Sequence, residues 1–109
     1  VVQIETPAGV AALDDILAVE GVDAVFIGPS DLSANYGHIG NPGAPEVVEA
    51  VQSSLDKIAA SDKASGIMAL DPAAAKSYLD RGVDFVAVSI DARTLALSLR
   101  AIAADMRNR

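Results

Sequence analysis

The sequence predicts an α/β fold of four βα units on a parallel sheet, and three observations indicate it. Four short runs rich in apolar residues recur along the chain, at residues 1–4, 24–27, 65–70 and 84–90. They show little of the alternation of a half-exposed strand, which is typical of parallel strands covered on both faces. Each run is followed by a stretch with the apolar spacing of a helix. Strands that alternate with helices in this way form a parallel sheet with right-handed crossovers.

The first unit pairs the strand at residues 1–4 with a helix that is expected to end near Gly21. Thr6 can cap this helix, and Pro7 suits its first position because no N–H donor is needed there. A glycine favours the left-handed backbone that ends many helices, so we expect one continuous helix up to this point. Its apolar stripe consists of Val10, Leu13, Ile16 and Leu17.

An irregular segment, residues 28–45, follows the second strand. It contains four glycines and three prolines, so we expect at most one helical turn, at residues 30–35. An amphipathic helix over residues 46–60 then leads to the third strand.

Two further helices are expected after the third and fourth strands, each introduced by an aspartate. Asp71 precedes a proline, which repeats the entry of the first helix, and Gly82 ends the helix that follows. Asp91 can cap a final helix that runs towards Met106.

Two architectures fit four consecutive βα units. One is a complete doubly wound domain, and the other is half of a (βα)8 TIM barrel, which needs roughly 250 residues when whole. The chain begins at Val1, inside a strand-like run, so we expect a single partial barrel domain over residues 1–109 whose N-terminal part is absent. In both architectures, functional groups gather at the carboxyl ends of the strands.

The composition argues against several classes of protein. With 109 residues the chain is long enough for one domain and too short for two. A formal net charge of −7 and scattered basic residues argue against a nucleic-acid partner. No apolar run approaches the ~20 residues that span a bilayer, so no membrane partner is expected. The absence of cysteine excludes disulfides and thiolate metal sites, and we expect a cytoplasmic protein.

Two acidic residues follow the first two predicted strands. Glu5 closes the first strand, and Asp31 lies just beyond the Gly-Pro-Ser turn that ends the second. If these strands are neighbours, both carboxylates reach one rim of the sheet, where they could hold a divalent metal such as Mg²⁺ or Mn²⁺. Alternatively, both are ordinary acids at helix entries, favoured by the helix dipole. The spacing alone leaves both interpretations open.

The turn at residues 28–30 could hold a carboxylate or a phosphate. Gly28 permits close approach, and Ser30 and Asp31 offer backbone N–H donors, although a plain strand-to-loop turn fits as well. His38 is the only histidine and lies in a glycine-rich loop, where it could act as an acid, a base or a ligand, although an exposed side chain without such a role is the commoner outcome.

Several stretches of the sequence together resemble one enzyme family. They are Val2-Gln3-Ile4-Glu5-Thr6, the segment at residues 21–33 with its Gly28-Pro29-Ser30-Asp31 motif, and the segments at residues 40–47, 66–68 and 81–88. The combination is similar to the metal-dependent (class II) 2-oxo-acid aldolases, which act on 4-hydroxy-2-oxoheptanedioate and on 2-keto-3-deoxy sugar acids. The resemblance extends over essentially the whole chain.

The resemblance implies a fold, a site and a reaction. The chain would form units five to eight of a (βα)8 barrel, its C-terminal half. Glu5 and Asp31 would bind the divalent metal (Mg²⁺, Mn²⁺ or Co²⁺), with Gln3 beside it, and Gly28 and Ser30 would bind the carboxylate of the pyruvate moiety. The substrate would be a 4-hydroxy-2-oxo acid, cleaved to pyruvate and an aldehyde through an enolate that the metal stabilises. Such enzymes serve the catabolism of aromatic or sugar acids.

The chain departs from the family's pattern in one respect. The family's catalytic histidine and arginine lie in the N-terminal half, and His38 does not match that histidine, so no catalytic residue is assigned. We expect little or no aldolase activity from these 109 residues alone.

A half barrel exposes sheet edges, so either the chain is trimmed from a longer one or halves pair between copies. The family's last helix packs against a neighbouring subunit, which makes residues 91–106 an expected contact in a homo-oligomer.

Two alternatives remain beside the aldolase. One is a lyase of the citrate-lyase β-subunit type, which acts on acyl-CoA thioesters. A CoA partner would favour basic residues near the site, and the stretch around Asp31 has none. The other alternative is a half barrel without enzymatic activity that serves as a binding or assembly module.

Overall fold

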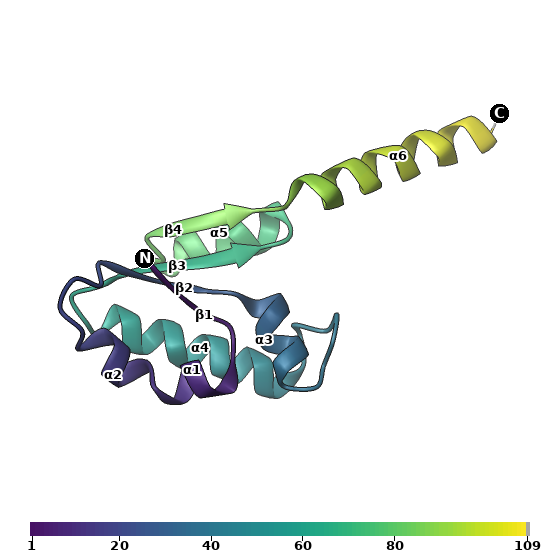
Figure 1. The fold of residues 1–109 in the computed structure, drawn as a ribbon. Helices are drawn as coiled ribbons and strands as arrows, with labels where there is room; N and C mark the ends of the chain where they lie inside the picture. The colour runs from purple at the N-terminus through teal and green to yellow at the C-terminus, as the bar shows by residue number, and fades with distance from the viewer. Residues whose placement is uncertain (109) are drawn as a thin grey trace.

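The computed structural model describes residues 1–108 and contains four parallel strands joined by helices (Figure 1). The strands are β1 (Val2–Ile4), β2 (Ala24–Ile27), β3 (Ala64–Ala69) and β4 (Phe85–Val88). The helices are α1 (Pro7–Ala11), α2 (Leu13–Leu17), α3 (Pro29–Asn35), α4 (Pro45–Ala59), α5 (Pro72–Asp80) and α6 (Asp91–Arg107). The predicted α/β class with four βα units is confirmed.

The order of the strands distinguishes between the two architectures that the sequence leaves open. The strands lie in the order β1-β2-β3-β4, and every neighbouring pair is parallel. A doubly wound sheet reverses its strand order at one point, so that helices cover both faces. Because this sheet shows no such reversal, it has the winding of a barrel segment.

One face of the sheet is buried beneath helices. Val25, Ile27 and Ile67 are fully buried and pack in one cluster with Leu13 of α2 and Val47 of α4. The apolar faces of the helices therefore match one face of the sheet only. This arrangement corresponds to the outer layer of a barrel wall.

The opposite face carries a row of residues that runs across all four strands. Gln3 pairs in register with Phe26, Phe26 with Gly66, and Gly66 with Phe85. The two phenylalanine rings stack with their centroids 5.6 Å apart, although their strands are not adjacent. They meet because the glycine between them has no side chain, and this face would line the interior of a closed barrel.

The single helix predicted up to Gly21 is wrong, because the chain forms two short helices that meet at Ala12. Thr6 caps the first of them as predicted, since its Oγ1 accepts a hydrogen bond from the Gly9 N–H at 3.0 Å. Gly9 also weakens the helix that contains it. Packing overrides the continuous apolar stripe: Leu13 is completely buried, whereas the rest of the stripe lies at the margin of the core.

The fourth unit also differs from its prediction. β4 ends at Val88 because Ser89 adopts a left-handed backbone (φ 64°), which no extended strand contains. Ile90, not Asp91, occupies the N-cap of α6. Asp91 is the first helical residue, and its carboxylate accepts a hydrogen bond from the Ala92 N–H at 2.7 Å.

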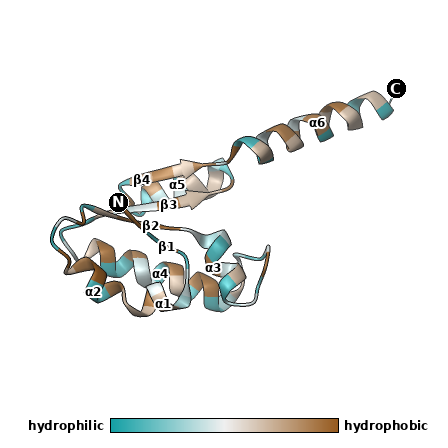
Figure 2. Cartoon of the chain, viewed as in Figure 1, coloured by the Kyte–Doolittle hydropathy of each residue, from teal (hydrophilic) through white to brown (hydrophobic). Residues whose placement is uncertain are grey.

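Helix α6 points away from the sheet (Figure 1) and contains no buried residue. The molecule measures 59 × 27 × 21 Å because of this extension. Figure 2 shows apolar segments along the projecting helix. Their large side chains, each more than half exposed, are Leu95, Leu99, Ile102 and Met106. No helix within residues 1–108 is long and apolar enough to cross a membrane.

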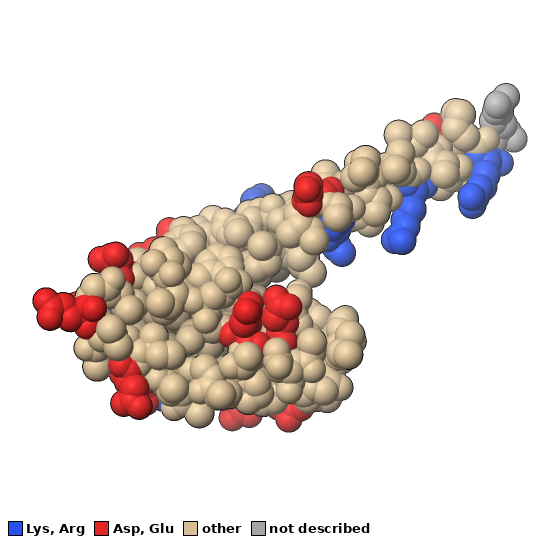
Figure 3. Space-filling view, in the orientation of Figure 1, with Lys and Arg blue, Asp and Glu red and all other residues tan. Residues whose placement is uncertain are grey.

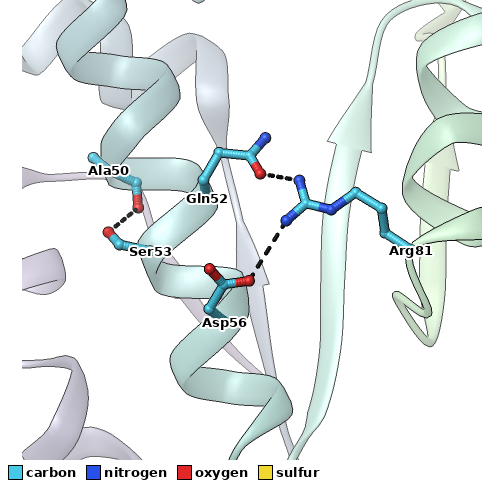
Figure 4. A network of polar contacts seen from close by, with 5 residues as sticks. All are labelled: Ala50, Gln52, Ser53, Asp56 and Arg81. Carbon is cyan, nitrogen blue, oxygen red and sulfur yellow. Dashed lines mark hydrogen bonds and ion pairs between the residues drawn. The ribbon is translucent and has the colours of Figure 1, made fainter.

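Polar contacts link the end of α5 to α4 on the helical face (Figure 4). The Arg81 guanidinium donates to the Gln52 side chain and reaches Asp56, with 3.5 Å between Nη2 and Oδ1. Both charged groups are exposed, so this ion pair aligns the helices more than it stabilises the fold.

The Phe85 ring lies directly over Gly66, which makes substitution of this glycine testable. A Cβ at this position would overlap the ring of Phe85, so an alanine must displace the ring from its stack on Phe26. We expect Gly66→Ala to destabilise the full-length protein by about 1–3 kcal/mol, as overpacking does, in urea denaturation.

A double-mutant cycle identifies the cause of that loss. In a Phe85→Leu background the ring is gone, so Gly66→Ala should cost little. An equal cost in both backgrounds would contradict the steric explanation.

Asp84 stabilises the end of the sheet at which strands β3 and β4 begin. Its Oδ2 accepts hydrogen bonds from the Ser65 N–H at 2.7 Å and the Ser65 hydroxyl at 2.9 Å. These bonds, led by the backbone one, lower the pKa of the Asp84 carboxyl. A carboxyl whose pKa is lower in the folded state contributes stability above its unfolded pKa, about 4, and loses it as the pH falls through the folded pKa.

We therefore expect Asp84→Asn to lower the melting temperature of the full-length protein at neutral pH. The difference from wild type should shrink as the pH falls below about 4, because the wild-type carboxyl then takes up a proton. Thermal denaturation across this range tests the sign, with Asp80→Asn on the exposed side of α5 as the matched control. A difference that stays constant with pH would rule out the carboxylate as its source.

Candidate active site

Parallel pairing places the ends of β1 and β2 side by side. Ile4 and Ile27 are the last register partners, and the Gly28 N–H donates to the Ile4 carbonyl at 3.0 Å. Glu5 leaves the sheet directly after this hydrogen bond. The prediction that both strands deliver their next residues to one rim of the sheet is therefore confirmed.

The side chains of Glu5 and Gln3 converge on Gly28. A Cβ built at Gly28 would lie 3.3 Å from Oε2 of Glu5 and 3.5 Å from Nε2 of Gln3. Gly28 is itself buried. Three of the five predicted site residues thus meet at one point, where the absence of a side chain lets a carboxylate and an amide approach the backbone closely.

The other two predicted residues lie in the first turn of α3. Gly28 is the N-cap of this helix, Asp31 lies in its first turn, and both Ser30 and Asp31 are exposed. No side chain caps α3, whereas Thr6 caps α1 and Asp71 caps α5. The first N–H groups of a helix have no partner within it, so those of Ser30 and Asp31 remain free to bind an anion.

The donor set suits a hard divalent cation. Glu5, half-buried, and Asp31, exposed, offer carboxylate oxygens from neighbouring elements. Within residues 1–108, no three His, Cys, Asp or Glu side chains gather into a metal-binding group. Two carboxylates are what Mg²⁺ commonly takes from a protein, since waters and substrate oxygens complete its coordination. The close approach of Glu5 to the backbone at Gly28 is compatible with such a site.

A cavity of about 490 Å³ opens at the carboxyl ends of β2 and β3. Ser30, Leu70, Tyr78 and Arg93 are among the residues that line it, and the two acidic residues of the site are not. Burial raises the pKa of the Tyr78 phenol, an effect that the nearby Arg81 charge opposes. The phenol therefore keeps its proton at neutral pH. Only Ser30 belongs both to this cavity and to the predicted site.

Other residues that the sequence singled out have structural contacts. The His38 ring pairs with the Glu46 carboxylate, and the His38 N–H donates to the Ser33 carbonyl at 2.7 Å. These contacts fix the loop before α4. Asp71 accepts hydrogen bonds from the Ala73 and Ala74 N–H groups at 3.0 and 2.9 Å, which confirms it as a helix cap.

Sequence reasoning missed Asn35, the last residue of α3. Its Nδ2 donates to the carbonyl of Glu5 at 3.1 Å and to the carbonyl of Asp31 at 3.0 Å. The second contact spans four residues and could be inferred from helical spacing. The first spans thirty residues, and nothing in the linear pattern indicates it.

Comparison with known proteins agrees with this geometry. The sequence profile of the family described as HpcH/HpaI aldolase/citrate lyase matches residues 1–97. The chain is 49% identical over 106 residues to a hydroxypyruvate/pyruvate aldolase of Roseovarius nubinhibens, and the aligned region covers 97% of this chain and 41% of that protein. It is 48% identical over 103 residues to a 4-hydroxy-2-oxo-heptane-1,7-dioate aldolase of Salmonella paratyphi B, covering 94% and 39%.

Solved structures give the same result for the fold. An HpcH/HpaI aldolase/citrate lyase family protein from Burkholderia cenocepacia superposes with a TM-score of 0.87 and 36% identity, over 97% of this chain and 42% of that one. An HpcH/HpaI aldolase from Desulfitobacterium hafniense gives 0.89 and 30%, over 98% and 42%. The chain spans about two-fifths of the length of these relatives. The resemblance expected from the sequence motifs is confirmed, and the chain belongs to the HpcH/HpaI aldolase/citrate lyase family.

Proposed function

We propose that this chain supplies the metal- and pyruvate-binding part of a class II aldolase, an aldehyde-lyase that cleaves a 4-hydroxy-2-oxo acid to pyruvate and an aldehyde. The observation that carries the proposal is the convergence of Glu5 and Gln3 on Gly28, the N-cap of the helix that contains Asp31. Relatives named as aldolases of pyruvate and of a hydroxy-oxo acid support this class of substrate.

Each site residue has a distinct role in this proposal. The carboxylates of Glu5 and Asp31 hold the divalent cation, which can be Mg²⁺, Mn²⁺ or Co²⁺ because oxygen ligands suit all three. When bound, the cation acts as a Lewis acid on the keto group of the substrate. The Gln3 amide orients the substrate beside Glu5, and the Ser30 and Asp31 N–H groups bind its carboxylate over Gly28.

These residues stabilise charge and do not move the proton of the 4-hydroxyl group. Cleavage breaks the bond between C3 and C4 and leaves its electron pair on the pyruvate fragment, where the negative charge develops on the keto oxygen, while the N–H donors hold the neighbouring carboxylate in place. No residue of this chain is assigned to proton transfer, and His38 is engaged by Glu46. In this proposal, the chain forms units five to eight of the barrel and acts in cytoplasmic catabolism of aromatic or sugar acids.

The citrate-lyase type of reaction is less well supported. An acyl-CoA substrate carries phosphate groups that call for several basic residues, as phosphates are bound by Arg and Lys. Arg93 is the one basic side chain among the described residues that line the cavity next to Ser30. The aldolase reaction needs no such cluster.

Loss of either acidic residue should abolish both metal binding and catalysis in the full-length protein. We expect Glu5→Gln and Asp31→Asn to lower kcat/KM for pyruvate release from a 4-hydroxy-2-oxo acid at least about 100-fold, since metal activation supplies several kcal/mol. Gly28→Ala should also weaken binding, because its methyl group would press on Glu5. Pyruvate release measured with lactate dehydrogenase, and Mn²⁺ titration, provide the two readouts.

Glu49→Gln, an exposed glutamate on α4, is the matched control and should behave as wild type. Mn²⁺ binding without cleavage of the oxo acid, but with cleavage of an acyl-CoA, would favour the citrate-lyase type. A wild-type protein that binds no metal would favour a module without enzymatic activity.

We further propose that a second copy of the chain covers the apolar face of α6. Leu95, Leu99, Ile102 and Met106 recur at intervals of four, three and four residues, which is the seam along which helices associate. Each is more than half exposed. An exposed apolar stripe of this length indicates an interaction surface.

Charge supports the same partner. Residues 91–109 contain four arginines and two acidic residues, whereas residues 1–90 contain four basic and thirteen acidic residues. Figure 3 shows basic side chains along α6 and acidic side chains on the body. Arg93, Arg100 and Arg107 follow one another at seven-residue intervals, so they form a stripe on one side of the helix. A basic helix and an acidic body attract one another between copies.

We expect the double variant Leu99→Asp, Ile102→Asp to convert a full-length oligomer into a smaller species in light scattering. Ala101→Asp adds one aspartate away from both the apolar face and the arginine stripe of α6 and should leave the mass unchanged. A monomeric wild type, or an unchanged mass in the double variant, would contradict the proposal.

A further inference from the structure

Asn35 contacts the backbone of both residues that are proposed to hold the metal. Its side-chain amide nitrogen donates to the Glu5 carbonyl at 3.1 Å and to the Asp31 carbonyl at 3.0 Å. An amide NH₂ group has two hydrogens, so one side chain can satisfy both contacts at once. The two carbonyls are thereby held close to the same nitrogen atom.

This link begins where the sheet ends. The ladder between β1 and β2 closes with the Ile4–Ile27 pair and the hydrogen bond from the Gly28 N–H. Beyond it, Glu5 enters the turn before α1, and Asp31 lies in α3. The Asn35 amide connects these two segments past the last hydrogen bond of the ladder.

The chemistry of the side chain matters more than its bulk. Asn35 is exposed, and an exposed hydrogen bond contributes little net stability because water can replace it. Aspartate has the same shape but no donor when ionised, and leucine has a similar shape but no polar atom. Glutamine keeps both donors on a side chain one methylene longer.

We propose that Asn35 is a positioning residue that sets the spacing of the Glu5 and Asp31 carboxylates and so determines the affinity of the site for a divalent cation. This inference rests on the proposed function, because it assumes that these two carboxylates hold the cation. Asn35 does not contact the cation or the substrate in this arrangement. It acts through the backbone of the residues that do.

Mn²⁺ binding to the full-length protein tests this role without any measurement of activity. Free Mn²⁺, followed by its electron paramagnetic resonance signal, gives the dissociation constant of wild type, Asn35→Ala, Asn35→Leu and Asn35→Gln. Partners that orient metal ligands are worth about 10–100-fold in metal affinity, so we expect losses in this range for the alanine and leucine variants. The glutamine variant should recover part of the loss, and the spectrum of bound Mn²⁺ should change with the altered spacing.

Two controls separate positioning from folding. Asn108→Ala makes the same substitution at the end of α6 and should bind Mn²⁺ as wild type does. Circular dichroism shows whether each variant is fully folded at the temperature of the titration. If Asn35 only stabilised the fold, a fully folded variant would bind Mn²⁺ with the affinity of wild type.

The remaining outcomes are distinguishable. The inference is overturned if both the alanine and the leucine variant bind Mn²⁺ with wild-type affinity. It is also overturned if only the alanine variant loses affinity, because the effect would then come from the bulk of the side chain and not from its hydrogen bonds. A wild-type protein whose Mn²⁺ binding is absent, or is unaffected by Glu5→Gln, overturns the proposed function and the inference with it. Glu5-dependent binding in wild type, with no effect at Asn35, overturns the inference alone.

Discussion

The hydrogen bond from the Gly28 N–H to the Ile4 carbonyl, 3.0 Å long, is the contact on which the candidate site depends. It is the last contact of the β1–β2 ladder and fixes which residue of each strand emerges at the rim. A shift of one residue in this register would turn one strand over relative to the other, so that Gln3 and Phe26 would no longer share a face of the sheet. The meeting of Glu5, Gln3 and Gly28 therefore follows from strand pairing.

Two glycines serve different ends of this arrangement. Gly66 lies in the middle of the sheet, where its missing side chain lets Phe26 and Phe85 stack across a strand. Gly28 lies at the rim, where the same absence lets the polar side chains of Glu5 and Gln3 approach the backbone. The Asp84–Ser65 contacts satisfy polar groups at the other edge. Barrels of this kind generally show the same division: residues at the N-terminal ends of the strands stabilise the fold, and residues at the carboxyl ends are available to bind ligands.

Much of the candidate site could be predicted because its residues follow strands directly. Glu5 and Asp31 each lie within a few residues of a strand end, and parallel strands bring such ends to one edge. The contact between Asn35 and Glu5 could not be predicted, since it joins residues thirty positions apart through a side chain whose direction depends on how α3 leaves the sheet. The cavity could not be predicted either, because separate elements form its walls.

The sequence by itself determined the four strands and the alternation of strand and helix, along with the caps at Thr6 and Asp71, because apolar period and capping chemistry act over a few residues. The tertiary structure decided that the winding is that of a barrel, that the helix predicted up to Gly21 breaks at Ala12, and that α6 points away from the sheet. These features depend on which surfaces remain to be covered once the strands have paired. That information lies in contacts between distant residues, which local patterns do not contain.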